Sequence, residues 1–542
     1  MSIRAELAHS QDELESKVIK VCLVTNNLTL LDGIILLGLI SAFLGIGIFG
    51  SSKTETTEDY FLAGRKLKWH QIGFSLFATN FSASALIGIT GAAYVIGIAI
   101  YNYEWVGILA LAFFALVMVG VVRGSKVYTI AEYLTERFDS RVKVIYSVFI
   151  ILMLVFLDMA GSLYAGGLLL NQFIPGLSTH VVIVLVMLIA GLYSVVGGMT
   201  AISRTDLYQS IILILGAFMI AYFSFSAVGG WAGFMESAPK GSLNLIRGFD
   251  DRAVPWTGLI VGVPIIGAYY WLVNQNMVQW VLSAESQTDA RRGLLLAGAL
   301  KTLGLFVIVL PGIAAISLIP GLTEPDRIYP AMLAELLPAG ILGLVLAGFV
   351  SALLSNTDST LHAASTLVTM DFVKRRHPEI SSHHLVRIGR ISTFVIIGVS
   401  AIWAPFIGNF GTLFEYVQGV LSYAVAPFVV VYLGGMFWPR ATSNGAIAAL
   451  TTGLVTAALI GLFGDGLGLF DIHYLHVPLP VTLVSLVTLN VVSRMSEAPD
   501  VDPRLLWSAT RTLEATQINL ARDRWIALGL VAITAASVII FW

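Results

Sequence analysis

A single lysine, Lys301, lies in the stretch GALKTLGLFVIVLPGIAA, residues 298–315, where almost every neighbour is apolar or small. A charged side chain at membrane depth costs at least about 3 kcal/mol, so proteins keep one where it faces a cavity or a partner. Two interpretations of Lys301 stay open and can hold together. The ammonium group either forms a salt bridge that fixes helix packing, with Asp158 as partner, or donates hydrogen bonds into a solute cavity.

Other charged residues stand in comparably apolar surroundings: Glu104, Asp158, Asp206, Asp358 and Glu415. Acidic groups therefore outnumber the one deep cation. This balance suits the binding of a cation, or of a neutral solute that requires many hydrogen bonds.

A polar stripe follows in 351-SALLSNTDSTLHAAST-366, where oxygen-bearing side chains recur at helical spacings of three or four residues. Ser355 and Asn356, set against backbone carbonyls near Ala78, supply about the five oxygen ligands that a small hard cation prefers. Sodium fits this description better than a transition metal, for which soft or imidazole ligands are expected. The alternative is that these side chains only form hydrogen bonds between helices.

Two apolar stretches carry residues that interrupt a helix. One is 78-ATNFSASALIGITG-91, rich in small and hydroxyl residues, and the other is 262-GVPIIGAYYWLVNQ-275, with Pro264 and Gly267. Backbone that leaves the helix inside a bilayer must line a cavity, and paired interrupted spans point to a transporter site between inverted repeats. Counted in spans, the second break lies five helices after the first. The alternative is that small residues only permit close helix packing.

The elements that must position these residues are membrane-spanning helices. The chain is 57% hydrophobic and 12% charged, which indicates an all-α integral membrane protein. At roughly 20 apolar residues per crossing, the sequence predicts about fourteen transmembrane helices. The predicted spans are residues 28–50, 72–98, 101–123, 143–173, 180–198, 204–229, 256–282, 292–319, 336–371, 386–405, 411–436, 443–464, 476–493 and 524–542.

The distribution of basic residues predicts the orientation. Most of the 31 Lys and Arg residues fall in alternate loops, and such residues are retained on the cytoplasmic side. We therefore expect a multi-pass protein of the cell inner (plasma) membrane with both termini extracytoplasmic. The expected parts are an extracytoplasmic tail (1–27), a peripheral helix (28–50), a first inverted repeat (72–229), a second inverted repeat (256–436) and additional C-terminal helices (437–542).

Several function classes are disfavoured by what the sequence lacks. It has no CxxC or HExxH metal motif and no GxxxxGK[ST] phosphate loop, so an ATP-driven pump is not expected. An enzyme is not expected either, although Glu104 and Asp158 could be taken as a carboxylate pair. The basic run 374-KRR-376 beside a span predicts orientation rather than nucleic-acid binding. The expected partners are a small-molecule substrate and the lipid bilayer, with the chain a monomer or weak homodimer; a sodium-leak channel or a solute sensor stays an alternative.

A set of short motifs resembles the solute:sodium symporter family, and within it the sodium/glucose branch, over about residues 55–445. Each motif is modest alone, but their order and spacing are specific. They are 58-EDYFLAGR-65, 128-YTIAEYLTERF-138, 197-GGMTAISRTDLYQ-209, 269-YYW-271, 309-VLPGIAA-315, 369-TMDFVKR-375 and 434-GGMFWPR-440.

The resemblance implies a fold of inverted five-helix repeats with broken first helices (LeuT-like), and a sodium ion as co-substrate. The main sodium site of the family corresponds to backbone carbonyls of Ala78 and Phe81, a carbonyl of Ala352, and the side chains of Ser355 and Asn356. Asn356 replaces a second serine, and its amide oxygen is still a hard ligand.

A possible second ion site is also implied by the resemblance. Asp206 matches a carboxylate that the family associates with sodium coupling, and the possible second site would combine it with Ser359. Asp358 stands where the sugar branch has a neutral residue and is more like the sodium/proline branch. The number of ions and the substrate branch therefore stay open.

For the solute, the resemblance implies a polyhydroxylated compound carried by alternating access. The implied substrate-binding residues are Asn80, Glu104, Asp158, Tyr270, Trp271, Lys301 and Gln418. Ala85 and Gly267 replace larger polar contacts, which predicts a wider pocket, and myo-inositol or a disaccharide is as compatible as glucose or galactose. The alternative is a sodium symporter for an amino acid or organic anion such as proline or sialic acid.

Overall fold

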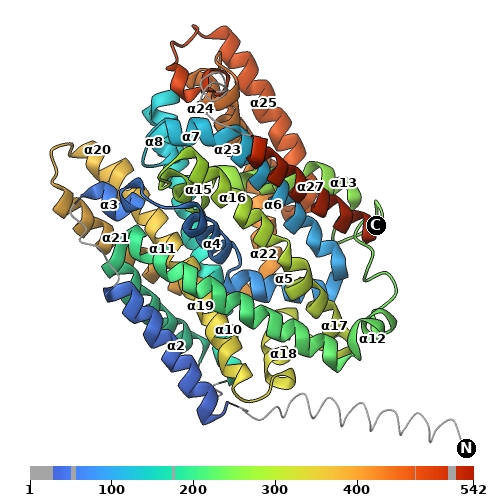
Figure 1. Cartoon of the computed structure of the whole chain (residues 1–542). Helices are drawn as coiled ribbons and strands as arrows, with labels where there is room; N and C mark the ends of the chain where they lie inside the picture. The colour runs from blue at the N-terminus through green and yellow to red at the C-terminus, as the bar shows by residue number, and fades with distance from the viewer. Residues whose placement is uncertain (1–27, 50–55, 174–177, 470, 511–520, 542) are drawn as a thin grey trace, which may run out of the picture.

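The computed structural model describes residues 28–49, 56–173, 178–469, 471–510 and 521–541. Within these ranges the chain forms helices joined by turns, and the pairing of extended backbone is limited to two isolated bridges. Figure 1 shows these helices gathered in one elongated bundle. The all-α membrane architecture predicted from the sequence is confirmed.

Eleven helices among the described residues are long and apolar enough to cross a membrane. The number is twelve if α22 (Leu413–Ala424) and α23 (Ala426–Phe437), bent by 53°, form one span. The predicted spans 72–98 and 101–123 both overlap one of these candidates, Ala83–Gly124, which contains Gly97, and another candidate begins at Gly198. Each glycine has a positive φ, of 70° and 59°, that redirects the chain without an intervening loop.

The other helices that matter for the site follow the predicted spans closely. They are α2 (Leu30–Phe49), α4 (Trp69–Asn80), α5 (Ala83–Ile96), α6 (Tyr101–Phe113), α9 (Ser140–Met153), α10 (Ala160–Phe173), α11 (Thr179–Ala227), α14 (Val263–Ala268), α15 (Gln275–Leu282), α16 (Gln287–Lys301), α17 (Leu310–Leu318), α19 (Ile341–Thr366), α21 (Ser382–Trp403), α24 (Ser443–Gly461), α25 (Pro478–Met495) and α27 (Ala521–Ile540).

The first break separates α4 from α5. Phe81 has non-helical backbone angles (φ −80°, ψ 51°) and Ser82 is extended. The Ser82 hydroxyl then caps α5 by accepting a hydrogen bond from the Ala85 amide at 3.2 Å. Because the helix stops at Asn80, the Ala78 carbonyl lies in the last turn, where the helix ladder no longer supplies a donor.

The second break lies at Asn274, between η5 (Tyr269–Val273) and α15. Asn274 is extended (ψ 123°), and its side-chain oxygen caps α15 by accepting from the Asn276 amide at 3.0 Å. The break therefore falls inside the predicted segment, and a smaller interruption lies at Gly262, between α13 (Trp256–Val261) and α14, directly before Pro264. Pro264 sits in the first turn of α14, where proline is tolerated. Gly267 instead packs against α6, since a Cβ there would lie 3.1 Å from Val106.

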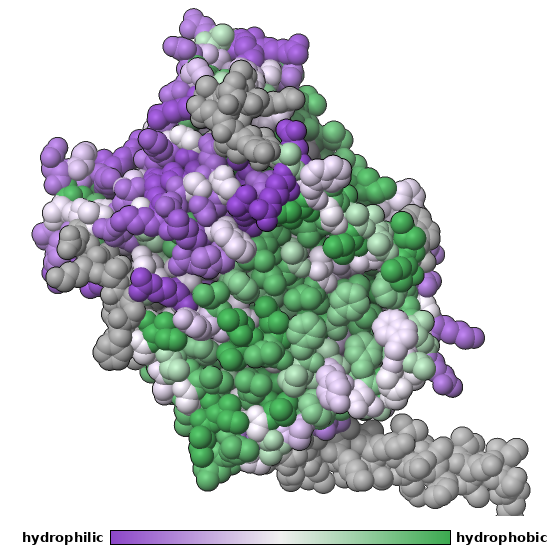
Figure 2. Space-filling view, in the orientation of Figure 1, coloured by the Kyte–Doolittle hydropathy of each residue, from purple (hydrophilic) through white to green (hydrophobic). Residues whose placement is uncertain are grey.

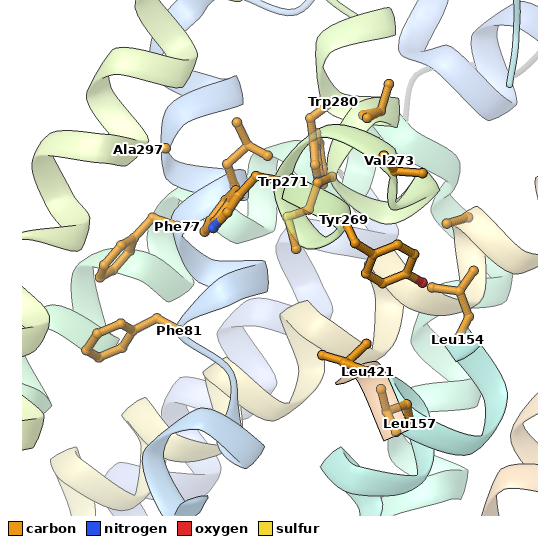
Figure 3. Close-up of a cluster of buried hydrophobic side chains, with 14 of the residues drawn as sticks. Phe77, Phe81, Leu154, Leu157, Tyr269, Trp271, Val273, Trp280, Ala297 and Leu421 are labelled. Atoms are coloured by element: carbon orange, nitrogen blue, oxygen red, sulfur yellow. The ribbon is translucent and has the colours of Figure 1, made fainter. Parts of the chain in front are cut away.

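Small residues bring the helices around the first break close together. A Cβ on Gly73 of α4 would lie 2.6 Å from Leu296 Cδ2, and one on Gly293 of α16 would lie 2.6 Å from Ile72 Cγ2. Phe77 and Phe81 stack their rings at 4.8 Å, as Figure 3 shows. Contacts of this kind fix the position of α4 where it ends.

One end of the bundle is hydrophilic, and the rest of the visible surface is largely apolar. Figure 2 shows hydrophilic residues gathered over α3 (Thr57–Leu62), α8 (Ile130–Arg137) and α20 (Lys374–Arg376), and hydrophobic residues over α2 and α16. The hydrophilic end carries the predicted cytoplasmic loops. An apolar belt next to a basic end is the pattern expected of a membrane protein.

Arg65 ties several segments together at this hydrophilic end. It follows Ala63 and Gly64, and all three residues have positive φ, of 51°, 60° and 53°. The Arg65 guanidinium donates to the carbonyls of Leu282, Lys126 and Val127 at 3.3, 2.7 and 3.0 Å. A bend that is costly for residues with a Cβ is thus held by hydrogen bonds to two other parts of the chain.

Candidate functional site

A cavity of about 150 Å³ lies between the two broken helices. Its walls come from α5, α6, η4 (Leu154–Met159), α14, η5 and α22. All of the residues predicted to bind solute line it: Asn80, Glu104, Asp158, Tyr270, Trp271, Lys301 and Gln418. Residues far apart in the sequence therefore converge on one space inside the apolar bundle.

Lys301, at the end of α16, is buried at the cavity wall. Its ammonium group donates to Asn80 Oδ1 at 2.8 Å and to Glu104 Oε2 at 2.6 Å. The predicted salt bridge exists, but Asp158 was the wrong partner, because α6 rather than η4 packs against this part of α16. The pair with Glu104 neutralises the deep cation and still leaves both groups at the cavity.

Trp271 lies against the same ammonium group. The Lys301 nitrogen is 5.2 Å from the centre of the Trp271 ring, within the range of a cation–π interaction. Gly107 of α6 makes this contact possible. A Cβ on Gly107 would lie 2.6 Å from Trp271 Nε1 and 2.7 Å from Lys301 Cε, so any larger residue would displace one of the two.

Two further polar groups face the cavity from other helices. Asp158 lies on a π-helical turn, and its carboxylate accepts a hydrogen bond from Asn274 Nδ2 at 3.5 Å. Gln418 lies on α22, and its buried Oε1 has no hydrogen-bond partner among the described residues. A buried amide oxygen without a donor is destabilising, so a ligand hydroxyl here would satisfy it.

Aromatic residues and a loop cover the cavity at the end away from the basic loops. Tyr103 and Phe414 both line it, with their rings edge to face at 5.1 Å, and the Tyr103 hydroxyl is 3.0 Å from that of Tyr474. Asp326, in the loop before α18 (Ile328–Leu336), accepts from the Leu413 amide at 2.8 Å. Burial raises the pKa of Asp326 to about 6, although this hydrogen bond opposes the shift.

Ala85 and Gly267 line the cavity, where larger polar residues would reach further into it. Ser82 and Ser84 also line it, with their hydroxyls 2.9 Å apart. Sequence reasoning placed both serines in the broken segment but assigned them no role. Hydroxyls that directly follow a helix break were the available signal.

A second polar region lies where α4, α11 and α19 meet, and we call it the ion region. Its centre is Asp206 of α11, which is fully buried and accepts a hydrogen bond from the Ser355 hydroxyl at 2.6 Å. The other carboxylate oxygen of Asp206 has no hydrogen-bond partner among the described residues. The predicted ion ligand Ser355 and the predicted second-site residue Asp206 thus lie together.

The ion region continues along α4. The Thr79 hydroxyl donates to the Ser359 hydroxyl at 3.1 Å, which joins the last turn of α4 to α19. Ala78, Phe81 and Ala352 are buried in the same group of helices. The arrangement offers peptide carbonyls, hydroxyls and a carboxylate, the hard oxygen ligands that an alkali ion takes.

Asn356 lies between the two regions. It lines the solute cavity, and its Nδ2 donates to the Ser162 hydroxyl of α10 at 2.6 Å. This leaves its amide oxygen as the group that could serve an ion or a solute. Asp358, two residues further along α19, is fully buried. Ser162 was not foreseen, because nothing in a single sequence pairs α10 with α19.

Glu415, one of the predicted deep charges, is exposed at the start of α22. Its carboxylate accepts from the Thr412 amide at 3.0 Å in a capping box. Its inclusion among the deep charges was wrong, since Glu415 lies in the exposed first turn of α22, which begins at Leu413. Among the described residues, no group of three or more His, Cys, Asp or Glu side chains is placed to hold a metal ion.

The fold and the pair of polar regions at its helix breaks define a membrane transporter of the ion-coupled type. The chain belongs to the sodium:solute symporter family, whose model matches residues 60–453.

Curated relatives match almost the whole chain. The sodium/glucose cotransporter of Vibrio parahaemolyticus is 31% identical over 96% of this chain and 99% of its own length. The sodium/myo-inositol cotransporter 2 of Mus musculus is 32% identical over 86% of this chain and 77% of its own.

Solved structures agree on the fold. A Na⁺-coupled sialic acid symporter in an outward-open state superposes with a TM-score of 0.78 at 20% identity, covering 88% of this chain and 99% of that one. Mhp1, a nucleobase-cation-symport-1 family transporter, gives a TM-score of 0.55 at 14% identity, over 81% of this chain and 95% of its own. The predicted LeuT-like class is therefore confirmed.

Proposed function

We propose that this protein is a sodium-coupled secondary active symporter that carries a small polyhydroxylated solute, a sugar or polyol, by alternating access. Family membership and the names of its sodium/glucose and sodium/myo-inositol relatives support the proposal. The observation that carries it is the cavity at the broken helices, where Asn80, Glu104, Lys301 and Gln418 gather.

This cavity suits hydroxyl groups. A hydroxyl both donates and accepts, so it can pair with a carboxylate, an ammonium or an amide in turn. The unpartnered Oε1 of Gln418 would gain a donor from such a solute. Trp271 and Tyr270 add flat faces against which a ring can pack.

An organic anion, the alternative, is less well supported. It would need a free cation in the cavity, and Lys301 is already paired with Glu104 at 2.6 Å. The sialic acid symporter resembles this chain at only 20% identity, which bears on the fold alone.

We assign the sodium ion to the ion region. The proposed main site is formed by the carbonyls of Ala78, Phe81 and Ala352 with the side chains of Ser355 and Asn356. The proposed second ion site involves Asp206, Asp358 and Ser359. Sodium bound between α4 and α19 would hold the broken helix in place and so order Asn80, which is the differential affinity that coupling requires.

The driving force is adequate for accumulation. Moving one charge through about 100 mV releases roughly 2.3 kcal/mol, and a tenfold sodium gradient adds about 1.4 kcal/mol. One ion per solute would therefore concentrate a neutral solute by roughly several hundredfold.

The remaining proposals concern the membrane location, the orientation, the oligomeric state and the boundaries of the repeats. We propose that the protein lies in the plasma membrane with both termini extracytoplasmic, as a monomer or weak homodimer without nucleic-acid partners. We propose residues 72–229 and 256–436 as the inverted repeats, flanked by a peripheral helix at 28–50 and additional helices in 437–542. The tail at 1–27 lies outside the described residues.

The test is uptake by proteoliposomes under an inward sodium gradient. Glucose, galactose, myo-inositol, proline and sialic acid serve as labelled solutes and as competitors. We expect accumulation of a polyol that requires sodium and collapses when the gradient is dissipated, with the solute recovered unmodified. Accumulation of proline or sialic acid in preference to every polyol would replace the proposal with the alternative.

A further inference from the structure

The charged groups that line the solute cavity do not balance. Two carboxylates and one ammonium group line it, from Glu104, Asp158 and Lys301. Lys301 is paired with Glu104 at 2.6 Å. Among the described residues, the Asp158 carboxylate enters no ion pair, so an otherwise neutral cavity carries one additional acid.

The hydrogen bond that Asp158 accepts does little to stabilise its negative charge. Its hydrogen bond from Asn274 Nδ2 is 3.5 Å long, at the weak limit for such a bond, and the donor is neutral. Leu157 and Leu421, both labelled in Figure 3, line the same cavity. A carboxylate without an ion pair, away from bulk water, favours a cation that can reach it.

Two local features of the backbone fix the position of Asp158. It lies on the π-helical turn Leu154–Met159, an irregularity that turns one residue out of the ordinary helix face. Asn274, its hydrogen-bond donor, is itself held at the second helix break by capping α15. Asp158 and Asn274 are therefore both positioned by irregular backbone beside the cavity.

We propose that the solute is a polyhydroxylated amine, such as an amino sugar or aminocyclitol, whose protonated nitrogen pairs with Asp158 while its hydroxyls reach Asn80 and Gln418. This inference rests on the proposed function and narrows its substrate class. An ammonium group donates up to three hydrogen bonds and accepts none, so the open acceptor positions of a carboxylate suit it.

A second metal ion fits this position less well. A hard cation takes several oxygen ligands together, whereas the described contact of Asp158 is the nitrogen of an amide. The ion region supplies such oxygens around Asp206 and Ser355 instead. The cation expected at Asp158 is therefore one that brings its own donors.

A cationic solute has an electrical consequence. Each transport cycle would move the charge of the amine in addition to that of sodium, so the membrane potential would act on both charges. The charge moved per solute is then one unit larger for an amine than for the matching neutral polyol.

The experiment uses the full-length protein in proteoliposomes, at a pH where the amines are protonated. Three matched pairs are compared under a sodium gradient: glucosamine with glucose, galactosamine with galactose, and scyllo-inosamine with scyllo-inositol. We expect at least one amine to be preferred about tenfold or more over its neutral counterpart, the ratio that 1.4 kcal/mol provides.

The variant Asp158→Asn keeps the size of the side chain and removes its charge. We expect it to weaken the apparent affinity for the preferred amine about tenfold more than that for the neutral counterpart, with the charge per solute still one unit apart. Asp250→Asn, in an exposed loop outside the cavity, is the matched control and should change neither.

The outcomes separate this inference from the function on which it rests. Sodium-driven uptake of neutral polyols with no preferred amine overturns the inference and leaves the symporter proposal standing. Equal weakening of both members of a pair by Asp158→Asn also overturns it, as does a change confined to sodium dependence. If no compound of either kind is taken up with sodium, the proposed function fails and the inference with it.

Discussion

The solute cavity and the ion region share α4 but are built differently. Asn80 faces a hollow space and hydrogen-bonds Lys301, whereas its neighbour Thr79 is buried and hydrogen-bonds Ser359 directly. The cavity keeps polar groups such as Gln418 Oε1 that have no partner in the described part of the chain. In the ion region, hydroxyls and a carboxylate already contact one another. A solute can therefore enter space that exists, whereas an ion would join groups that already contact one another, such as Ser355 and Asp206.

This difference predicts that the largest effect comes from breaking the charge pair of the cavity. Lys301→Met should reduce solute uptake about a hundredfold or more, because breaking a buried pair costs about 3–5 kcal/mol and leaves Glu104 uncompensated. Uptake and the thermal unfolding temperature of the purified protein measure the two consequences. Stabilisation by added sodium should persist, since the ion region is untouched.

The double variant Lys301→Met with Glu104→Gln is the control for that prediction. It removes both charges, so the unfolding temperature should recover while uptake does not. Normal uptake by the single variant would show that Lys301 only supports helix packing. The cavity would then no longer differ from the ion region in having polar groups that serve a solute.

Two substitutions of intermediate effect should show that the ion region binds sodium and that the cavity binds the solute. Ser355→Ala removes a hydroxyl of the ion region and should raise the sodium concentration for half-maximal uptake about tenfold, since contacts to charged groups are worth about 1.5–3 kcal/mol. Gln418→Ala should instead raise the half-saturating solute concentration. Uptake titrated separately with sodium and with solute gives both values for each variant. Equal shifts of both values in both variants would contradict the division.

The smallest effect is expected at Asp326, which belongs to the cover of the cavity and to neither region. Its pKa in the folded protein is raised by burial from the usual 3.8 to about 6. The folded state therefore holds this proton more tightly than the unfolded state. The contribution of Asp326 to stability is complete below pH 3.8 and is lost as the pH rises to about 6.

Asp326→Asn should flatten this slope, so that the unfolding temperature varies less between pH 4 and 7 than in the wild type. The difference should be a few degrees, on the scale of about 1.4 kcal/mol per unit of pKa. We expect the variant to keep the wild-type affinities for sodium and for the solute, because Asp326 belongs to neither region. A wild-type protein that becomes more stable from pH 4 to pH 6 through this residue would reverse the assigned direction.

The charged residues of the cavity could be singled out in the sequence because charge inside a membrane is expensive, whereas Asn80, Tyr270, Trp271 and Gln418 came from the family resemblance. Residues such as Lys301 and Glu104 stand out in apolar stretches, and they can be stabilised only by meeting one another. Their exact pairing was not predictable, and Asp158 was chosen wrongly as the partner of Lys301. Pairing depends on which helices touch and at what rotation, and one sequence does not encode this locally.

Irregular backbone explains many of the features that could not be predicted from the sequence. The π-helical turns at 154–159 and 269–273 add a residue to the turn, so a 3.6-residue periodicity assigns the wrong face beyond them. Asn274 begins α15 by capping it with its own side chain, a role that looks unremarkable in sequence beside Pro264. The ion region was easier to foresee, because Ser355 and Ser359 lie on the regular helix α19 and keep its spacing.

The bend at residues 63–65 constrains how the segment before α4 can move. Arg65 joins that segment to the end of α15 and to the loop before α8 through one planar group with several fixed donors. A lysine has one nitrogen and cannot span these acceptors. The segment that leads into the first broken helix is therefore anchored, at the basic end, to the half-helix that follows the second break, and neither can swing away without releasing the other.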